Sequence, residues 1–109
     1  MKNITKLAAG AALGLWGSMA YAADDLSLQL KWVTQAQFGG YYVALDKGFY
    51  EEEGLNVTIK PGGPDIAPVQ VLLGGGADVM VDWLPSALAA REKGAPIVNI
   101  AQPFATSGL

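Results

Sequence analysis

Apolar and polar residues alternate over a short stretch around position 29 of this chain. The apolar side of the alternation comprises Leu26, Leu28, Leu30 and Trp32, and the polar side comprises Ser27, Gln29 and Lys31. Because successive side chains of a β-strand point to opposite faces, this pattern predicts a first strand with one apolar face.

A helical pattern follows this strand. The apolar side chains that recur at helical spacing are Phe38, Tyr41, Tyr42 and Leu45. Gly48 stands where a glycine commonly ends a helix, and residues 49–53 are expected to form one more short helical turn that ends at Gly54. Residues 55–60 are rich in β-branched side chains, so they are expected to form the second strand.

Proline and glycine divide the next part of the chain. The Pro-Gly-Gly-Pro run at 61–64 breaks the chain, and Asp65 is expected to cap a helix that continues to Leu73, with Pro68 in its first turn. Three consecutive glycines then end this helix. A short buried strand is expected over residues 77–81.

A helix over residues 83–93 and a fourth strand over residues 97–101 complete the order β-α-β-α-β-α-β. Right-handed crossovers of this kind build a parallel sheet with helices on both faces. The sequence therefore predicts an α/β fold.

The first residues indicate export. Lys2 and Lys6 accompany an apolar stretch over residues 7–19, and Ala-Tyr-Ala at 20–22 has the small-x-small pattern that precedes signal cleavage. The alternative, a membrane-spanning helix, needs about 20 apolar residues, and glycines dilute this stretch. We expect residues 1–22 to be a signal peptide and the mature chain to begin at Ala23.

The charge and the cysteine content of the chain limit which classes of partner and which covalent links can be expected. The chain carries 7 basic and 10 acidic residues, and two of the basic ones belong to the expected signal, so the mature part is distinctly acidic. An acidic surface argues against nucleic acid or anionic membrane as a partner. The chain has no cysteine, so neither a disulfide nor a lipid anchor on a cysteine is expected. A soluble periplasmic protein without membrane insertion fits best.

Ligands of open parallel sheets bind beyond the carboxyl ends of the strands. Four segments are expected to meet there: residues 32–40, 61–65, 82–86 and 102–104. Trp32, Tyr41 and Tyr42 are candidates for stacking on a flat heteroaromatic ring, because aromatic faces offer a large contact area at little rotamer cost. The alternative is that all three pack in the core.

Gln35 and Gln37 offer hydrogen-bond donors and acceptors that suit the amino and ring-nitrogen groups of a pyrimidine. The alternative is that both amides bond only to water or local backbone. Residues 32–40 contain no Arg or Lys, yet an oxyanion could still be bound by backbone N–H groups near Gly39 and Gly40.

Further candidates follow the other strands. Asp82 is a candidate acceptor for a ligand amino group or, alternatively, the cap of the next helix. Trp83 offers a second aromatic wall or packs under the loop. Gly62 and Gly63 allow close approach of a ligand or a tight turn. Gln102 completes the set from the fourth segment. We expect no catalytic residue, metal or cofactor.

Several motifs resemble those of a known family. They are the segment from Trp32 to Leu55, Gly-Phe-Tyr-Glu-Glu-Glu-Gly-Leu at 48–55, Gly-Gly-Ala-Asp-Val at 75–79 and Ala-Arg-Glu-Lys-Gly at 90–94. They are similar to periplasmic substrate-binding proteins of ABC importers, in the thiamine-pyrimidine-precursor (NMT1/THI5-like) branch related to nitrate, sulfonate and taurine binders. The resemblance implies a two-lobed type II periplasmic-binding-protein fold, αβα in three layers, of about three times this length. Residues 23–109 are then the N-terminal portion of the first lobe of a truncated chain.

The resemblance also implies a function: delivery of a small heteroaromatic molecule, similar to a thiamine pyrimidine precursor, to an ABC transporter permease. Members of the branch usually read Asp-Trp-x-Pro-Asn where this chain has Lys-Trp-Val-Thr-Gln at 31–35, so Gln35 replaces the Asn that contacts the pyrimidine. Riboflavin, sulfonate and nitrate remain alternative ligands. A pyrimidine-precursor biosynthetic enzyme on the same fold is the other alternative, although such enzymes use a histidine and this chain has none.

Overall fold

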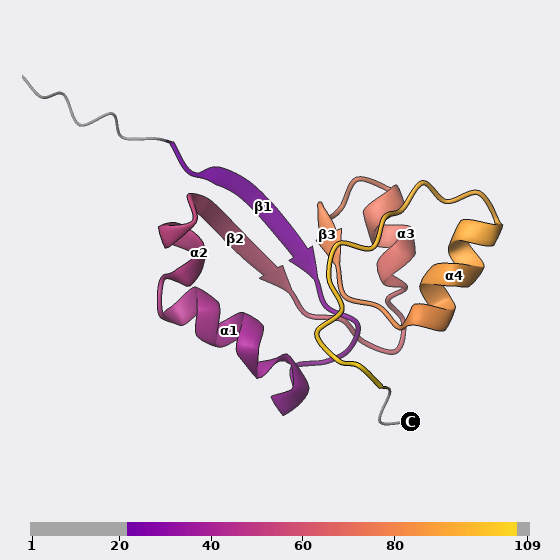
Figure 1. The fold of residues 1–109 in the computed structure, drawn as a ribbon, viewed down its shortest axis with the longest axis horizontal. Helices are drawn as coiled ribbons and strands as arrows, with labels where there is room; N and C mark the ends of the chain where they lie inside the picture. The colour runs from indigo at the N-terminus through magenta and orange to yellow at the C-terminus, as the bar shows by residue number, and fades with distance from the viewer. Residues whose placement is uncertain (1–21, 107–109) are drawn as a thin grey trace, which may run out of the picture.

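The described part of the computed structural model, residues 22–106, contains a parallel three-stranded sheet (Figure 1). Its strands are β1 (Asp24–Gln29), β2 (Leu55–Lys60) and β3 (Val79–Met80), in the order β2-β1-β3. β1 lies in the centre and pairs with β2 over its whole length, from Asp24 opposite Leu55 to Gln29 opposite Lys60. β3 pairs with the end of β1, Leu28 lying opposite Val79. The parallel pairing confirms the predicted α/β class.

Five helical elements connect and cover the strands. They are η1 (Ala36–Phe38), α1 (Gly39–Asp46), α2 (Phe49–Glu52), α3 (Pro68–Leu73) and α4 (Leu84–Glu92). In Figure 1, α1 and α2 run along one side of the β1–β2 pair, while α3 and α4 lie on the other side, next to β3. Of these helices in the described range, none is long and apolar enough to cross a bilayer.

The core forms where the apolar face of the sheet meets α1 and α2. Its buried members are Leu28, Leu30, Phe38 and Val57. Three tyrosines, Tyr41, Tyr42 and Tyr50, pack around this cluster from the two helices. The alternation at the first strand and the helical spacing of the aromatics therefore meet in one apolar layer, as the sequence predicts.

Gln29 departs from the simple alternation, because it is buried although it lies on the polar side. Its side chain is only 3% exposed. Its Nε2 donates to the carbonyl oxygens of Leu30 at 3.0 Å, Lys60 at 3.3 Å and Pro61 at 3.1 Å. A buried amide with such partners is satisfied, and here it ties the end of β1 to the end of β2. The carboxyl end of β1 is thus covered on both faces, as expected for the central strand of a parallel sheet.

β1 ends at Gln29 rather than at Trp32. The chain continues straight for one residue, since the Leu30 N–H still donates to the Lys60 carbonyl at 2.9 Å, and then bends away. Trp32 therefore leaves the apolar face and is 37% exposed. The alternative that Trp32 packs in the core is wrong, because the strand stops before its position.

The two side-chain caps that the sequence indicates do not form. The residue before α3 is Ala67, and Pro68 occupies the first helical turn, as expected. Asp65 lies in a turn with Pro64, two residues too early to cap this helix, so that prediction is wrong. Trp83 is the N-cap of α4 and no side chain caps that helix, so the capping alternative for Asp82 is also wrong.

The predicted fourth strand at 97–101 is absent from the described residues. Ile97 is buried, whereas Val98 and Ile100 are largely exposed. A strand needs a neighbour to accept its hydrogen bonds, and within residues 22–106 this segment pairs with no strand. Composition favoured the strand, but the absence of a ladder partner in this range decides against it.

Candidate functional site

A cavity of about 380 Å³ opens at the start of α1, where the chain has left the carboxyl end of β1. The residues that line it are Gln37, Gly40, Tyr41, Pro103 and Phe104. We call it the α1 cavity. It brings together two of the four segments that the sequence predicts to meet at this edge, residues 32–40 and 102–104. All five lining residues are uncharged, and two of them are aromatic.

The residues around Gln35 position the amide of Gln37, which lines this cavity. Gln37 Nε2 donates to Gln35 Oε1 at 3.1 Å, so the two predicted amide residues form one hydrogen-bonded pair. Gln35 has an extended backbone and directly precedes η1, which leads into α1. Both side chains are exposed, so their remaining hydrogen-bonding groups are accessible.

Two hydrogen bonds that involve hydroxyl groups link Tyr41 and Tyr42 of α1 to neighbouring residues. Thr34 Oγ1 and Tyr42 OH lie 3.1 Å apart, and Tyr50 OH donates to the Tyr41 carbonyl at 3.2 Å. Partial burial raises the pKa of Tyr41 above its ordinary value, because desolvation disfavours the phenolate. Tyr41 borders both the core and the α1 cavity, whereas Tyr42 packs against the core.

Phe104 lines the α1 cavity but was not among the contacts predicted from the sequence. It is 66% exposed, and its neighbour Gln102 donates through Nε2 to the Phe104 carbonyl at 3.1 Å. Gln102, a predicted ligand contact, thus braces the Phe104 backbone. The signal that could have identified Phe104 was the presence of an aromatic residue inside a segment already expected at the carboxyl edge.

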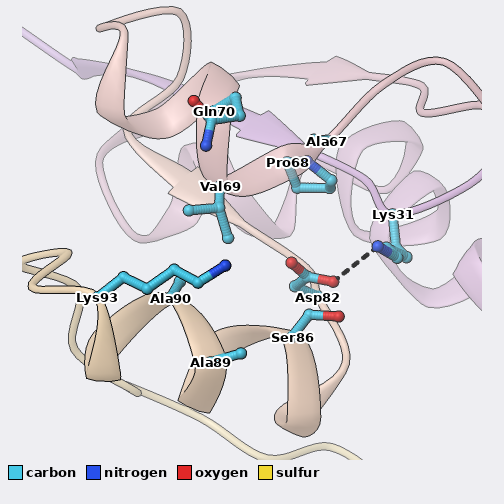
Figure 2. Close-up of a pocket in the computed structure, with 10 residues that line it drawn as sticks. All are labelled: Lys31, Ala67, Pro68, Val69, Gln70, Asp82, Ser86, Ala89, Ala90 and Lys93. Carbon is cyan, nitrogen blue, oxygen red and sulfur yellow. Dashed lines mark ion pairs between the residues drawn. The ribbon is translucent and has the colours of Figure 1, made fainter.

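A second cavity, of about 250 Å³, lies between α3 and α4 (Figure 2). We call it the interhelix cavity. Its lining residues are Lys31, Ala67, Pro68, Val69, Gln70, Asp82, Ser86, Ala89, Ala90 and Lys93. Figure 2 shows Ser86, Ala89 and Ala90 of α4, with Lys93 just after its end, along one wall and Val69 and Gln70 of α3 along the other.

An ion pair occupies one end of the interhelix cavity. Lys31 Nζ lies 2.9 Å from Asp82 Oδ1, and the Asp82 side chain is only 4% exposed. The same carboxylate oxygen accepts the Trp83 N–H at 2.8 Å. The Lys31 ammonium also lies 4.8 Å from the centre of the Trp83 ring, within cation–π range. Asp82 is therefore already paired, and one face of Trp83 is covered.

The two lysines of this cavity were missed as well. Residues 32–40 contain no basic side chain, yet Lys31 directly precedes them. Lys93, which follows the last residue of α4, lies on the side of the cavity away from Lys31 (Figure 2). The i, i+3, i+4, i+7 spacing of Ser86, Ala89, Ala90 and Lys93 was a signal that these residues share one helix face.

The remaining predicted contacts lie outside both cavities. Trp32 and Trp83 are exposed and line neither of them. Gly62 packs against the chain that leaves β1: its N–H donates to the Trp32 carbonyl at 2.9 Å, and a Cβ there would come within 2.7 Å of the Trp32 nitrogen. Only glycine fits at this crossing. Gly63 beside it is buried. Among residues 22–106, no three of His, Cys, Asp or Glu converge as a metal site would require.

The chain matches a known protein family. The family model described as NMT1/THI5 like matches residues 35–108, which is most of the chain. A curated relative, the formylaminopyrimidine-binding protein of Halalkalibacterium halodurans, is 30% identical over 80 residues. That match covers 73% of this chain and 24% of the relative, so the chain spans about a quarter of the relative's length. The chain belongs to the NMT1/THI5-like family.

Proposed function

We propose that this NMT1/THI5-like chain forms part of a binding protein for a small planar heteroaromatic molecule of the pyrimidine class. The observation that carries the proposal is the α1 cavity, where an amide and two aromatic side chains converge at the carboxyl edge of a parallel sheet. The name of the formylaminopyrimidine-binding relative supports both the ligand class and a binding role rather than a catalytic one.

The chemistry of the lining favours a neutral ring. Tyr41 and Phe104 offer apolar faces, and Gln37 offers both a donor and an acceptor. A sulfonate or nitrate ion would gain most from a positive side chain, but the α1 cavity is lined by uncharged residues, and Lys31 is held by Asp82 elsewhere. The volume of about 380 Å³ lies within the range of roughly 300–1,000 Å³ for ligand pockets.

Export and transport complete the proposal. The basic start, the apolar stretch at 7–19 and Ala-Tyr-Ala at 20–22 support delivery to the periplasm, although these residues lie outside the described part of the structure. We propose that the mature protein passes its ligand to an ABC transporter permease. N-terminal sequencing of periplasmic protein should give Ala23 as the first residue, and a soluble form that retains Met1 would contradict export.

Calorimetry on the full-length protein tests the ligand class. Aminopyrimidines should bind, whereas taurine, nitrate and riboflavin should bind at least about tenfold more weakly, because the uncharged α1 cavity favours a single neutral ring. Tight binding of taurine or nitrate without any response to pyrimidines would refute the proposal. Preferential binding of riboflavin would keep the binding role but replace the ligand.

Phe104→Ala tests the location of the site. Loss of an aromatic wall should weaken pyrimidine binding by about tenfold, or about 1.4 kcal/mol, with little change in stability because Phe104 is largely exposed. Val98→Ala is the matched control: it removes an exposed apolar side chain from the same C-terminal stretch, outside the cavity. Equal affinities for both variants would place the ligand elsewhere.

A further inference from the structure

We propose that Gln29 is a positioning residue for the ligand site, although it lines neither cavity. Its buried amide holds the start of the turn over residues 32–37, and this turn leads the chain into the α1 cavity. The inference rests on the proposed function and adds a residue that acts on the ligand only through the turn. Its basis is the set of hydrogen bonds at the point where β1 and β2 end.

The turn over residues 32–37 is exposed along its whole length but is bounded by buried residues. Leu30, two residues before the turn, is 0% exposed, and Phe38, directly after it, is 5% exposed. The conformation of the turn is therefore set at its two ends, because none of its own side chains is buried. A turn that is already held in place costs less conformational entropy when a ligand binds to it.

Packing of Phe38 in the core fixes the end of the turn, and Gln29 fixes the start. Gln29 Nε2 donates to the Leu30 carbonyl at 3.0 Å and to the Pro61 carbonyl at 3.1 Å. Within residues 22–106, no backbone N–H donates to either of these two oxygens. The third acceptor, the Lys60 carbonyl, also receives the Leu30 N–H at 2.9 Å. The Leu30 and Pro61 carbonyls thus depend on the Gln29 amide for a partner.

The bridge made by Gln29 supports a backbone hydrogen bond next to it. The Gly62 N–H donates to the Trp32 carbonyl at 2.9 Å. Gly62 directly follows Pro61, and Trp32 is the first residue of the turn. Loss of the bridge between Leu30 and Pro61 should therefore loosen the bond between Trp32 and Gly62 and let the start of the turn shift. Any resulting change in affinity must pass through the turn.

Gln29→Met in the full-length protein tests the role of the amide. Methionine has a similar length but no donor, so the packing is kept while the Leu30 and Pro61 carbonyls lose their partner. Binding of 4-aminopyrimidine to the folded protein, measured by calorimetry, should weaken by about fivefold or more, because the ligand must then order the turn. Parent affinity in this variant would overturn the proposal.

Gln29→Asn is the second variant, and it decides the question if Gln29→Met does not fold. Its amide is one methylene shorter and does not reach both carbonyl oxygens as Gln29 does. Affinity for 4-aminopyrimidine should fall by at least about twofold, because part of the bridge is lost. An affinity equal to that of the parent would overturn the proposal here as well.

Val57→Ala is the control for a loss of stability alone. Val57 is buried in the middle of β2, away from the hydrogen bonds at the strand ends. The truncation should lower the urea midpoint because it removes core packing, while the affinity of the folded protein should stay within about twofold of the parent. Equal losses of affinity in Val57→Ala and Gln29→Met would contradict a positioning role.

Amide hydrogen exchange in the ligand-free protein gives a readout that needs no ligand. Exchange at Gly62, whose N–H bonds to the Trp32 carbonyl, should be about fivefold faster in Gln29→Met than in Val57→Ala. If the parent binds 4-aminopyrimidine and exchange at Gly62 is the same in both variants, the positioning role is overturned and the proposed function stands. If exchange at Gly62 is faster but the parent binds no aminopyrimidine, the proposed function is overturned and the hold of Gln29 on the turn stands.

Discussion

The α1 cavity and the interhelix cavity differ in how their polar groups are satisfied. In the interhelix cavity, the Asp82 carboxylate is nearly buried and already holds Lys31 and the Trp83 N–H. At the α1 cavity, Gln37 and its neighbour Gln35 are exposed, and among the described side chains they bond only to each other. The first arrangement is internally satisfied, whereas the second keeps hydrogen-bonding groups for a partner.

This difference assigns different roles to the two cavities: the interhelix cavity stabilises the fold, and the α1 cavity binds the ligand. A paired charge taken out of water costs desolvation free energy and cannot release its partner without a further penalty. An exposed amide exchanges water for a ligand at little cost. We therefore expect substitutions in the interhelix cavity to lower stability and substitutions at the α1 cavity to lower affinity.

The largest expected effect is that of Asp82→Ala on stability. Removal of the carboxylate leaves the partly buried Lys31 ammonium without its partner, so the free energy of unfolding should fall by about 3 kcal/mol. Urea unfolding measures this change, and ligand affinity of the folded protein should stay within about threefold. Asp46→Ala, which removes an exposed carboxylate at the end of α1, is the control and should change stability by no more than about 0.5 kcal/mol.

A double variant separates the charge from the packing. Lys31→Met combined with Asp82→Leu replaces the pair by apolar side chains and should recover most of the loss, because no unpaired charge remains. If Asp82→Ala lowers affinity strongly without affecting stability, the interhelix cavity is itself a recognition site and the contrast between the two cavities fails.

Trp32→Ala is expected to have an intermediate effect. Trp32 has left the core, so its truncation should lower the free energy of unfolding by about 1 kcal/mol. Leu30→Ala in the buried cluster should cost about 2–5 kcal/mol. The predicted stacking of Trp32 on the ligand stays a prediction and implies a loss of about 2 kcal/mol in binding. Paired urea melts and ligand titrations distinguish the roles: unchanged affinity would remove Trp32 from the site.

The smallest expected effect concerns the stability of the fold in acid, and it involves Asp78, the residue just before β3. Asp78 Oδ2 accepts from the Ser27 N–H at 2.8 Å and from Ser27 Oγ at 2.9 Å. The backbone hydrogen bond is the main reason why the pKa of Asp78 is lowered. A lowered pKa in the folded state means that the carboxylate contributes stability above its unfolded pKa and that this contribution is lost as the pH falls through the folded pKa.

Unfolding by urea at a series of pH values below about pH 4 tests this contribution. Asp78→Asn should remove the part of the acid dependence that belongs to this group and lower the urea midpoint slightly at neutral pH. Asp24→Asn, an exposed carboxylate at the start of β1, should leave the acid dependence close to that of the parent protein. An acid dependence that is the same in Asp78→Asn and the parent would contradict the assignment.

Periodicity and punctuation in the sequence determined most of the local structure. The strand at 55–60 and the helix at 84–92 lie where the pattern predicts them, within one residue. The pairing of Gln37 with aromatic residues at the carboxyl edge also follows from topology, since parallel strands bring their following loops to one end. Local propensity and hydrophobic period are properties of neighbouring residues, so the sequence alone carries them.

Only the tertiary structure decided the roles that depend on distant partners. Asp82 pairs with Lys31, more than fifty positions away in the chain, and therefore does not cap α4. Gln29 is buried because the carboxyl end of β1 is covered on both faces, and its amide donates to the Pro61 carbonyl in the loop after β2. Residues 97–101 have the composition of a strand but no ladder partner in the described range. Burial, ion pairing and strand pairing are relations between separate segments, and no local pattern specifies which partner is present.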